Sequence, residues 1–121
     1  MKQEMLKGVL ILVIEDDFDI YELLRDRLNE LGFAVLGTTT GEQGLALIEY
    51  QASIGCPIGG LLVNLHMSGL DGMAVLKQMR EHHPKIPVII MSSLPNGGRL
   101  GQALRLGARD YITKPFDDEE L

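Results

Sequence analysis

Residues 9–17 of the chain read VLILVIEDD, six apolar residues followed directly by three acidic ones. The apolar run does not alternate with polar positions and is rich in β-branched side chains, which is typical of a strand buried on both faces. Such strands belong to parallel sheets that have helices packed on either side. The acids Glu15, Asp16 and Asp17 then stand at the carboxyl end of the strand, where sheets of this kind place their binding sites.

Outward from this strand, short apolar runs and helical spacing alternate along the chain. Further strands are predicted at residues 33–36, 61–65, 88–91 and 110–113. Helices are predicted at residues 20–31, 41–48 and 72–79. Thr40 and Gln43 form a capping box for the second of these helices, and Asp71 is a suitable N-cap for the third. A fourth helix within residues 94–106 carries three glycines, each costing about 1 kcal/mol relative to alanine, so we expect it to be short or mobile.

This alternation of strands and helices predicts an α/β fold with right-handed crossovers and a parallel sheet. We expect a single domain over residues 1–121, because the chain has neither an internal repeat nor a linker. The acidic residues 117–120 would begin a fifth helix, and the chain stops there. We therefore expect the fifth helix to be largely missing and the chain to be a fragment of a longer protein.

Charge and composition exclude several classes of function. The formal net charge is −6, from 11 basic and 17 acidic residues, which argues against binding of nucleic acid by this domain. The longest apolar run is too short to cross a membrane, and no signal segment opens the chain. The single cysteine, Cys56, cannot form an internal disulfide. We expect a cytoplasmic protein.

Polar side chains follow the strands at the edge where their carboxyl ends should meet. They include the acids after the first strand, Asn64 after the third, Ser92 after the fourth and Lys114 after the fifth. Clustered carboxylates suggest Mg²⁺, and a lysine with a hydroxyl suits a phosphoryl oxygen. The alternative is a solvated loop edge, because α/β folds often carry polar residues there.

Four segments give the chain a specific resemblance. Residues 11–17 (ILVIEDD), 70–72 (LDG), 87–92 (PVIIMS) and 107–116 (GARDYITKPF) resemble, in order and spacing, the motifs of bacterial two-component response-regulator receiver domains. The resemblance covers nearly the whole chain. It implies a flavodoxin-like, doubly wound (βα)5 three-layer sandwich with the parallel strand order 2-1-3-4-5.

The same resemblance implies roles for individual residues. The metal site would consist of Glu15, Asp16, Asn64 and the backbone carbonyl of His66. Ser92 would be the switch hydroxyl, Tyr111 the switch aromatic residue and Lys114 the cationic partner of the phosphoryl group.

One departure from the family pattern bears directly on function. Position 64, where the family carries the phosphoacceptor aspartate, holds an asparagine. An amide is a poor nucleophile for phosphoryl transfer, and the loss of one negative charge should leave Mg²⁺ bound weakly at most. Ser68 also replaces a usual proline, and Ser93 a small apolar residue. We expect a receiver that is not an enzyme, is not phosphorylated and acts through protein–protein interaction.

Two alternatives remain open at this point. The asparagine could be an engineered block in an ordinary phosphoacceptor domain. The fold could also host another class, such as a flavin-binding protein or a Mg²⁺-dependent phosphatase, although the first loop lacks a phosphate-cradling run and a paired nucleophilic aspartate. The partners implied by the resemblance are a histidine kinase, a phosphotransfer protein or an attached output domain. A homodimer could form through the sheet face left bare by the missing helix.

Overall fold

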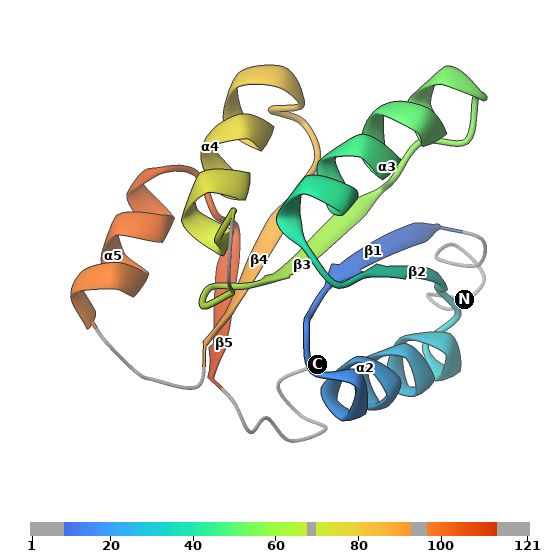
Figure 1. The fold of residues 1–121 in the computed structure, drawn as a ribbon, viewed down its shortest axis with the longest axis horizontal. Coiled ribbons are helices and arrows are strands. Elements are labelled where there is room, and N and C mark those ends of the chain that lie inside the picture. The colour runs from blue at the N-terminus through green and yellow to red at the C-terminus, as the bar shows by residue number, and fades with distance from the viewer. Residues whose placement is uncertain (1–8, 68–69, 93–96, 114–121) are drawn as a thin grey trace.

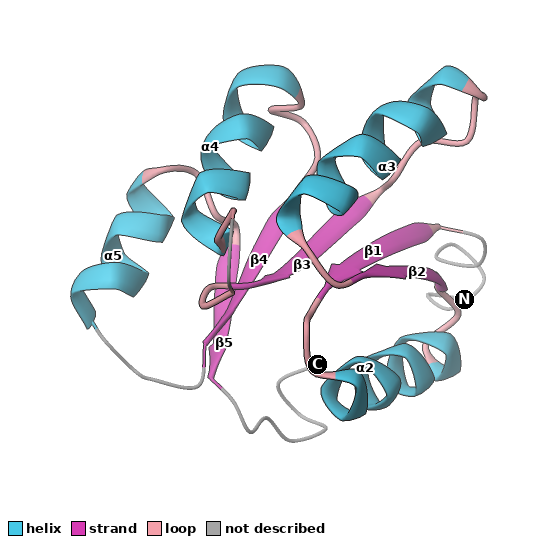
Figure 2. Cartoon of the chain, viewed as in Figure 1, coloured by secondary structure: helices cyan, strands magenta, loops and turns pink. Residues whose placement is uncertain are grey.

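The computed structural model describes residues 9–67, 70–92 and 97–113, and strands and helices alternate through these segments (Figures 1 and 2). The strands are β1 (Leu10–Ile14), β2 (Ala34–Thr38), β3 (Gly60–Asn64), β4 (Val88–Ser92) and β5 (Asp110–Thr113). The helices are α2 (Phe18–Glu30), α3 (Gly41–Ser53), α4 (Gly72–His82) and α5 (Gly97–Arg105). The fifth helix expected from residue 117 lies outside the described residues.

All five strands are parallel, and their order in the sheet is β2-β1-β3-β4-β5. This arrangement confirms the predicted flavodoxin-like fold. It makes β1 and β3 direct neighbours, with Ile14 opposite Val63. In Figure 2, α3, α4 and α5 lie on one side of the sheet and α2 lies on the other.

The residues of β1 explain why the apolar run has no polar alternation. Leu12 and Ile14 point into the core beneath α3 and α4 and are fully buried. Ile11 and Val13 point the other way, into a second core shared with Leu24 of α2. Successive side chains of a strand face opposite sides of its sheet, so a central strand covered on both sides needs apolar residues at every position.

The helix starts follow the predicted capping signals. The Thr40 hydroxyl accepts a hydrogen bond from the backbone N–H of Gln43 at 3.1 Å, and the Asp71 carboxylate accepts one from the N–H of Ala74 at 3.0 Å. Gly32 has a φ of 99° just after α2, a conformation that favours glycine at a helix end. The glycine-bearing helix α5 has 9 residues against 13 in α2, so it is short as predicted.

Gly72 allows α4 to begin directly against the end of β3. A Cβ atom at this position would lie 2.6 Å from the carbonyl oxygen of Asn64 and 2.7 Å from the Cα of Leu65. The N–H of Gly72 also donates to the carbonyl of Leu65 at 3.2 Å. The close approach is therefore between two backbones, and it fixes the strand end that carries Asn64.

Replacing Gly72 with alanine should lower the free energy of unfolding by about 1–3 kcal/mol, because the added methyl group has no room beside the backbone of β3. Urea unfolding followed by circular dichroism measures the change. The matched control is Gly101→Ala in α5, where the nearest atom to a new Cβ is 3.6 Å away. That change should raise stability by up to about 1 kcal/mol. Equal effects of the two substitutions would contradict the packing described for Gly72.

Candidate functional site

The ends of β1, β3 and β4 bring polar side chains into an otherwise apolar core. Glu15 follows β1 and is 2% exposed, Asn64 ends β3 at 6%, and Ser92 ends β4 at 1%. Asp16, the next residue after Glu15, is exposed. Burying polar groups is unfavourable unless they are hydrogen-bonded, so the contacts among them decide what the site can do.

The side-chain amide of Asn64 links the first and third strands. Its nitrogen, Nδ2, donates to Oε1 of Glu15 at 3.2 Å and to Oδ1 of Asp16 at 3.2 Å. Its oxygen, Oδ1, accepts from the backbone N–H of His66 at 3.2 Å. Both N–H groups of the amide are therefore donated to carboxylates, and the amide oxygen accepts from the loop that follows β3.

This hydrogen-bond network admits a single orientation of the amide. A flipped Asn64 would place Oδ1 against two carboxylate oxygens, and neither of these can donate a hydrogen bond when ionised. It would also set the NH₂ group against the N–H of His66. All three neighbours therefore assign the nitrogen to the acidic side.

The acidic cluster at residues 15–19 divides between two tasks. Glu15 and Asp16 meet Asn64, whereas Asp17 is the N-cap of α2. The Asp17 carboxylate accepts from the N–H groups of Asp19 and Ile20 at 3.0 and 3.2 Å. Of the two or three carboxylates expected at this edge, two therefore meet Asn64, and the carboxylate of Asp17 is used by the helix start.

For the remaining predicted site residues, the structure describes few or no side-chain contacts at the site. His66 has an exposed side chain and meets Asn64 through its backbone N–H. Tyr111 lies on β5, opposite Ile90 of β4. Lys114, Ser68 and Ser93 lie outside the described residues, and the roles expected for all of them stay predictions.

Beside the two acids is a cavity that the sequence did not predict. It has a volume of about 210 Å³ and is lined by Glu15, Asp16, Phe18, Tyr21, Gly37, Thr38 and Thr39. The ring of Tyr21 packs against β2 at Gly37. A Cβ atom at position 37 would come within 2.6 Å of the Cζ atom of Tyr21, so only glycine leaves room for the ring. A glycine inside a strand often marks a close approach of this kind. Gly37 was therefore the feature of the sequence that could have indicated the packing of Tyr21.

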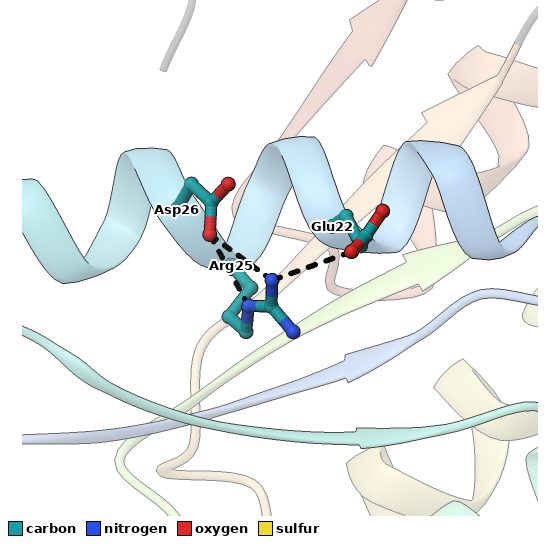
Figure 3. A network of polar contacts seen from close by, with 3 residues as sticks. All are labelled: Glu22, Arg25 and Asp26. Carbon is teal, nitrogen blue, oxygen red and sulfur yellow. Dashed lines mark hydrogen bonds and ion pairs between the residues drawn. The ribbon is translucent and has the colours of Figure 1, made fainter.

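A group of surface charges supports the Tyr21 wall of this cavity. The Arg25 guanidinium lies 5.7 Å from the centroid of the Tyr21 ring. Figure 3 shows the same guanidinium held by Asp26 at 3.2 Å and by Glu22 at 3.6 Å. Exposed ion pairs contribute little stability on their own, so we regard the group as orienting Arg25 over the ring.

The residues at the site fit a divalent cation poorly. Glu15 and Asp16 are suitable oxygen ligands for Mg²⁺, but between them stands an amide nitrogen that offers a metal no lone pair. Among the described residues, no group of three or more histidine, cysteine, aspartate or glutamate side chains is arranged to hold a metal ion. Asn64, expected as a ligand, acts here as a hydrogen-bond donor.

Within the same described residues, no helix combines the length and apolar character needed to span a membrane.

Comparisons with known proteins place the chain in a family. The model of the response regulator receiver domain matches residues 11–121. The chain belongs to this family.

Individual relatives agree with that assignment. The DNA-binding transcriptional regulator NtrC of Escherichia coli (strain K12) is 38% identical over 111 residues, which are 92% of this chain and 23% of the relative. The transcriptional regulatory protein CpxR of Klebsiella pneumoniae is 37% identical over 113 residues, 92% of this chain and 45% of the relative. The chain therefore spans less than half the length of either relative.

A solved structure is similar over nearly the same extent. The receiver domain of NtrX from Brucella abortus has a TM-score of 0.82 and 30% sequence identity. The match covers 91% of this chain and 89% of that one.

Replacing Asn64 with alanine should lower the free energy of unfolding by about 1–3 kcal/mol, because it removes a donor from the buried Glu15 carboxylate. Chemical denaturation of both proteins measures the difference. Asn29→Ala, at an exposed position near the end of α2, is the control and should change stability by no more than about 0.5 kcal/mol. If the Asn64 variant were as stable as the control, the hydrogen bonds of the Asn64 amide would contribute nothing measurable to the free energy of unfolding.

Proposed function

We propose that this receiver domain is not phosphorylated and that it acts by binding other proteins. The observation that carries the proposal is Asn64, which ends β3 next to Glu15 and Asp16. By resemblance to the family, this is the position of the aspartate that accepts the phosphoryl group.

The chemistry of the amide supports this proposal. Formation of an aspartyl phosphate requires a carboxylate oxygen to attack phosphorus. The amide oxygen of Asn64 is neutral, and the nitrogen lone pair is delocalised, so neither atom is an effective nucleophile. In addition, the oxygen accepts the N–H of His66 and both N–H groups are donated to carboxylates. The domain would then have no catalytic step of its own.

The same proposal extends to the remaining family residues. Ser92 and Tyr111 would be the switch pair, and Lys114 would face the position of the phosphoryl group. Ser92 is buried at the end of β4, which suits a residue that reports on the site from inside the core. Mg²⁺ would bind weakly at most.

We further propose the classes of partner. The partner would be a histidine kinase, a phosphotransfer protein or a covalently attached output domain, and the length of the transcriptional regulators among the relatives favours the last of these. The formal net charge of −6 argues against contact with nucleic acid through this domain. We also propose that the protein is cytoplasmic and that the domain can form a homodimer.

The membership of the chain in the receiver family leaves the flavin-binding and phosphatase alternatives without support. An engineered block of an ordinary phosphoacceptor domain remains the second candidate, because Glu15, Asp16 and Ser92 are all retained around Asn64. The two candidates differ in what a restored aspartate would do.

The test is incubation of the chain and its Asn64→Asp variant with MgCl₂ and acetyl phosphate, followed by intact mass at neutral pH. We expect the unmodified chain to gain no phosphoryl group, because position 64 offers no carboxylate. A phosphoryl group on the unmodified chain would refute the proposal.

The variant separates the two candidates. If Asn64→Asp gains a phosphoryl group, the surrounding site is competent and residue 64 alone blocks the reaction, as an engineered block requires. If the variant also stays unmodified, the rest of the site has diverged, as a natural binding-only receiver allows. Circular dichroism of the variant confirms that it is folded in either case.

A further inference from the structure

The position of the Asn64 amide has a consequence for metal binding, and the inference rests on the proposed function. We propose that the amide takes over the structural task of a divalent cation at this site, so that Glu15 and Asp16 are held in place without metal. The folded domain would then be insensitive to Mg²⁺.

The geometry supplies one donor for each carboxylate. Glu15 and Asp16 are consecutive residues, and one oxygen of each lies 3.2 Å from the same Nδ2 atom of Asn64. An NH₂ group has two hydrogens, so each carboxylate receives one. Both distances lie within the range of N–H···O hydrogen bonds.

The charge at the site favours the same assignment. An aspartate at position 64 would bring a third carboxylate to Glu15 and Asp16, and like charges at this distance disfavour one another. A cation would be needed to offset them. With asparagine the site has one negative charge fewer, and the partly positive NH₂ group faces the two that remain.

Entry of a cation would require the amide to leave. Turning the amide oxygen toward the metal would break the hydrogen bonds to Glu15 and Asp16 and also the one from His66. The NH₂ group would then face the backbone N–H of His66, two donors in contact. Burial of Asn64, at 6% exposure, leaves water little access to compensate for these losses.

The test compares thermal unfolding in MgCl₂ with unfolding in NaCl of equal ionic strength, together with calorimetric titration of Mg²⁺ alone. The wild-type chain should have the same melting temperature in both salts. Asn64→Asp should melt lower than wild type in NaCl and gain stability in MgCl₂, with Mg²⁺ affinity at least about tenfold above that of wild type.

A second variant guards against loss of folding in the first. Asn64→Ala removes both donors without adding charge, and it should respond to MgCl₂ where the wild type does not. Asp17→Asn is the matched control, because Asp17 caps α2 and lies outside the hydrogen bonds of Asn64. It should leave the wild-type indifference to Mg²⁺ unchanged.

A wild-type chain stabilised by MgCl₂ as strongly as either Asn64 variant would overturn the inference. This result is distinguishable from failure of the proposed function. Mg²⁺ binding by wild type without uptake of a phosphoryl group would refute the role given to the amide and leave the proposed function standing, whereas uptake of a phosphoryl group would refute the proposed function.

Discussion

The hydrogen bonds of the Asn64 amide join residues 48 and 49 positions apart in the chain, and the site depends on them. They can form because the sheet makes β1 and β3 neighbours and because both strands end at the same edge. Gly72 then lets α4 start against the backbone of Asn64. The polar contacts at the strand ends are therefore a product of the parallel topology, and the topology in turn requires apolar residues throughout β1.

Within the described residues, the sequence was sufficient for the strands and helices and for the edge where polar residues gather. The unbroken apolar run identified β1 as a strand covered on both faces, and Asp71 and Thr40 marked the starts of α4 and α3 correctly. Periodicity does not say which strands are neighbours, because pairing depends on contacts distant in sequence. The strand order came instead from the family resemblance carried by segments such as residues 107–116.

The details of the site could not be read in the same way. An aspartate just before a helix has the same local signal whether it caps the helix or faces a binding site, and only the structure assigns Asp17 to the cap of α2. The direction of the Asn64 amide depends on three partners that come from two loops. The cavity beside Tyr21 depends on the packing of α2 over Gly37. The amide direction and the cavity depend on contacts between residues distant in sequence, and Gly37 within β2 was the one local signal for the cavity.

We infer that the Asn64 amide, rather than a metal ion, holds Glu15 and Asp16. The most direct measurement is nuclear magnetic resonance of the Asn64 side-chain NH₂ group during titration with MgCl₂. We predict two separate proton signals that exchange slowly with water and do not move as Mg²⁺ is added. Rapid exchange, together with a saturable shift of these signals on addition of Mg²⁺, would contradict the account.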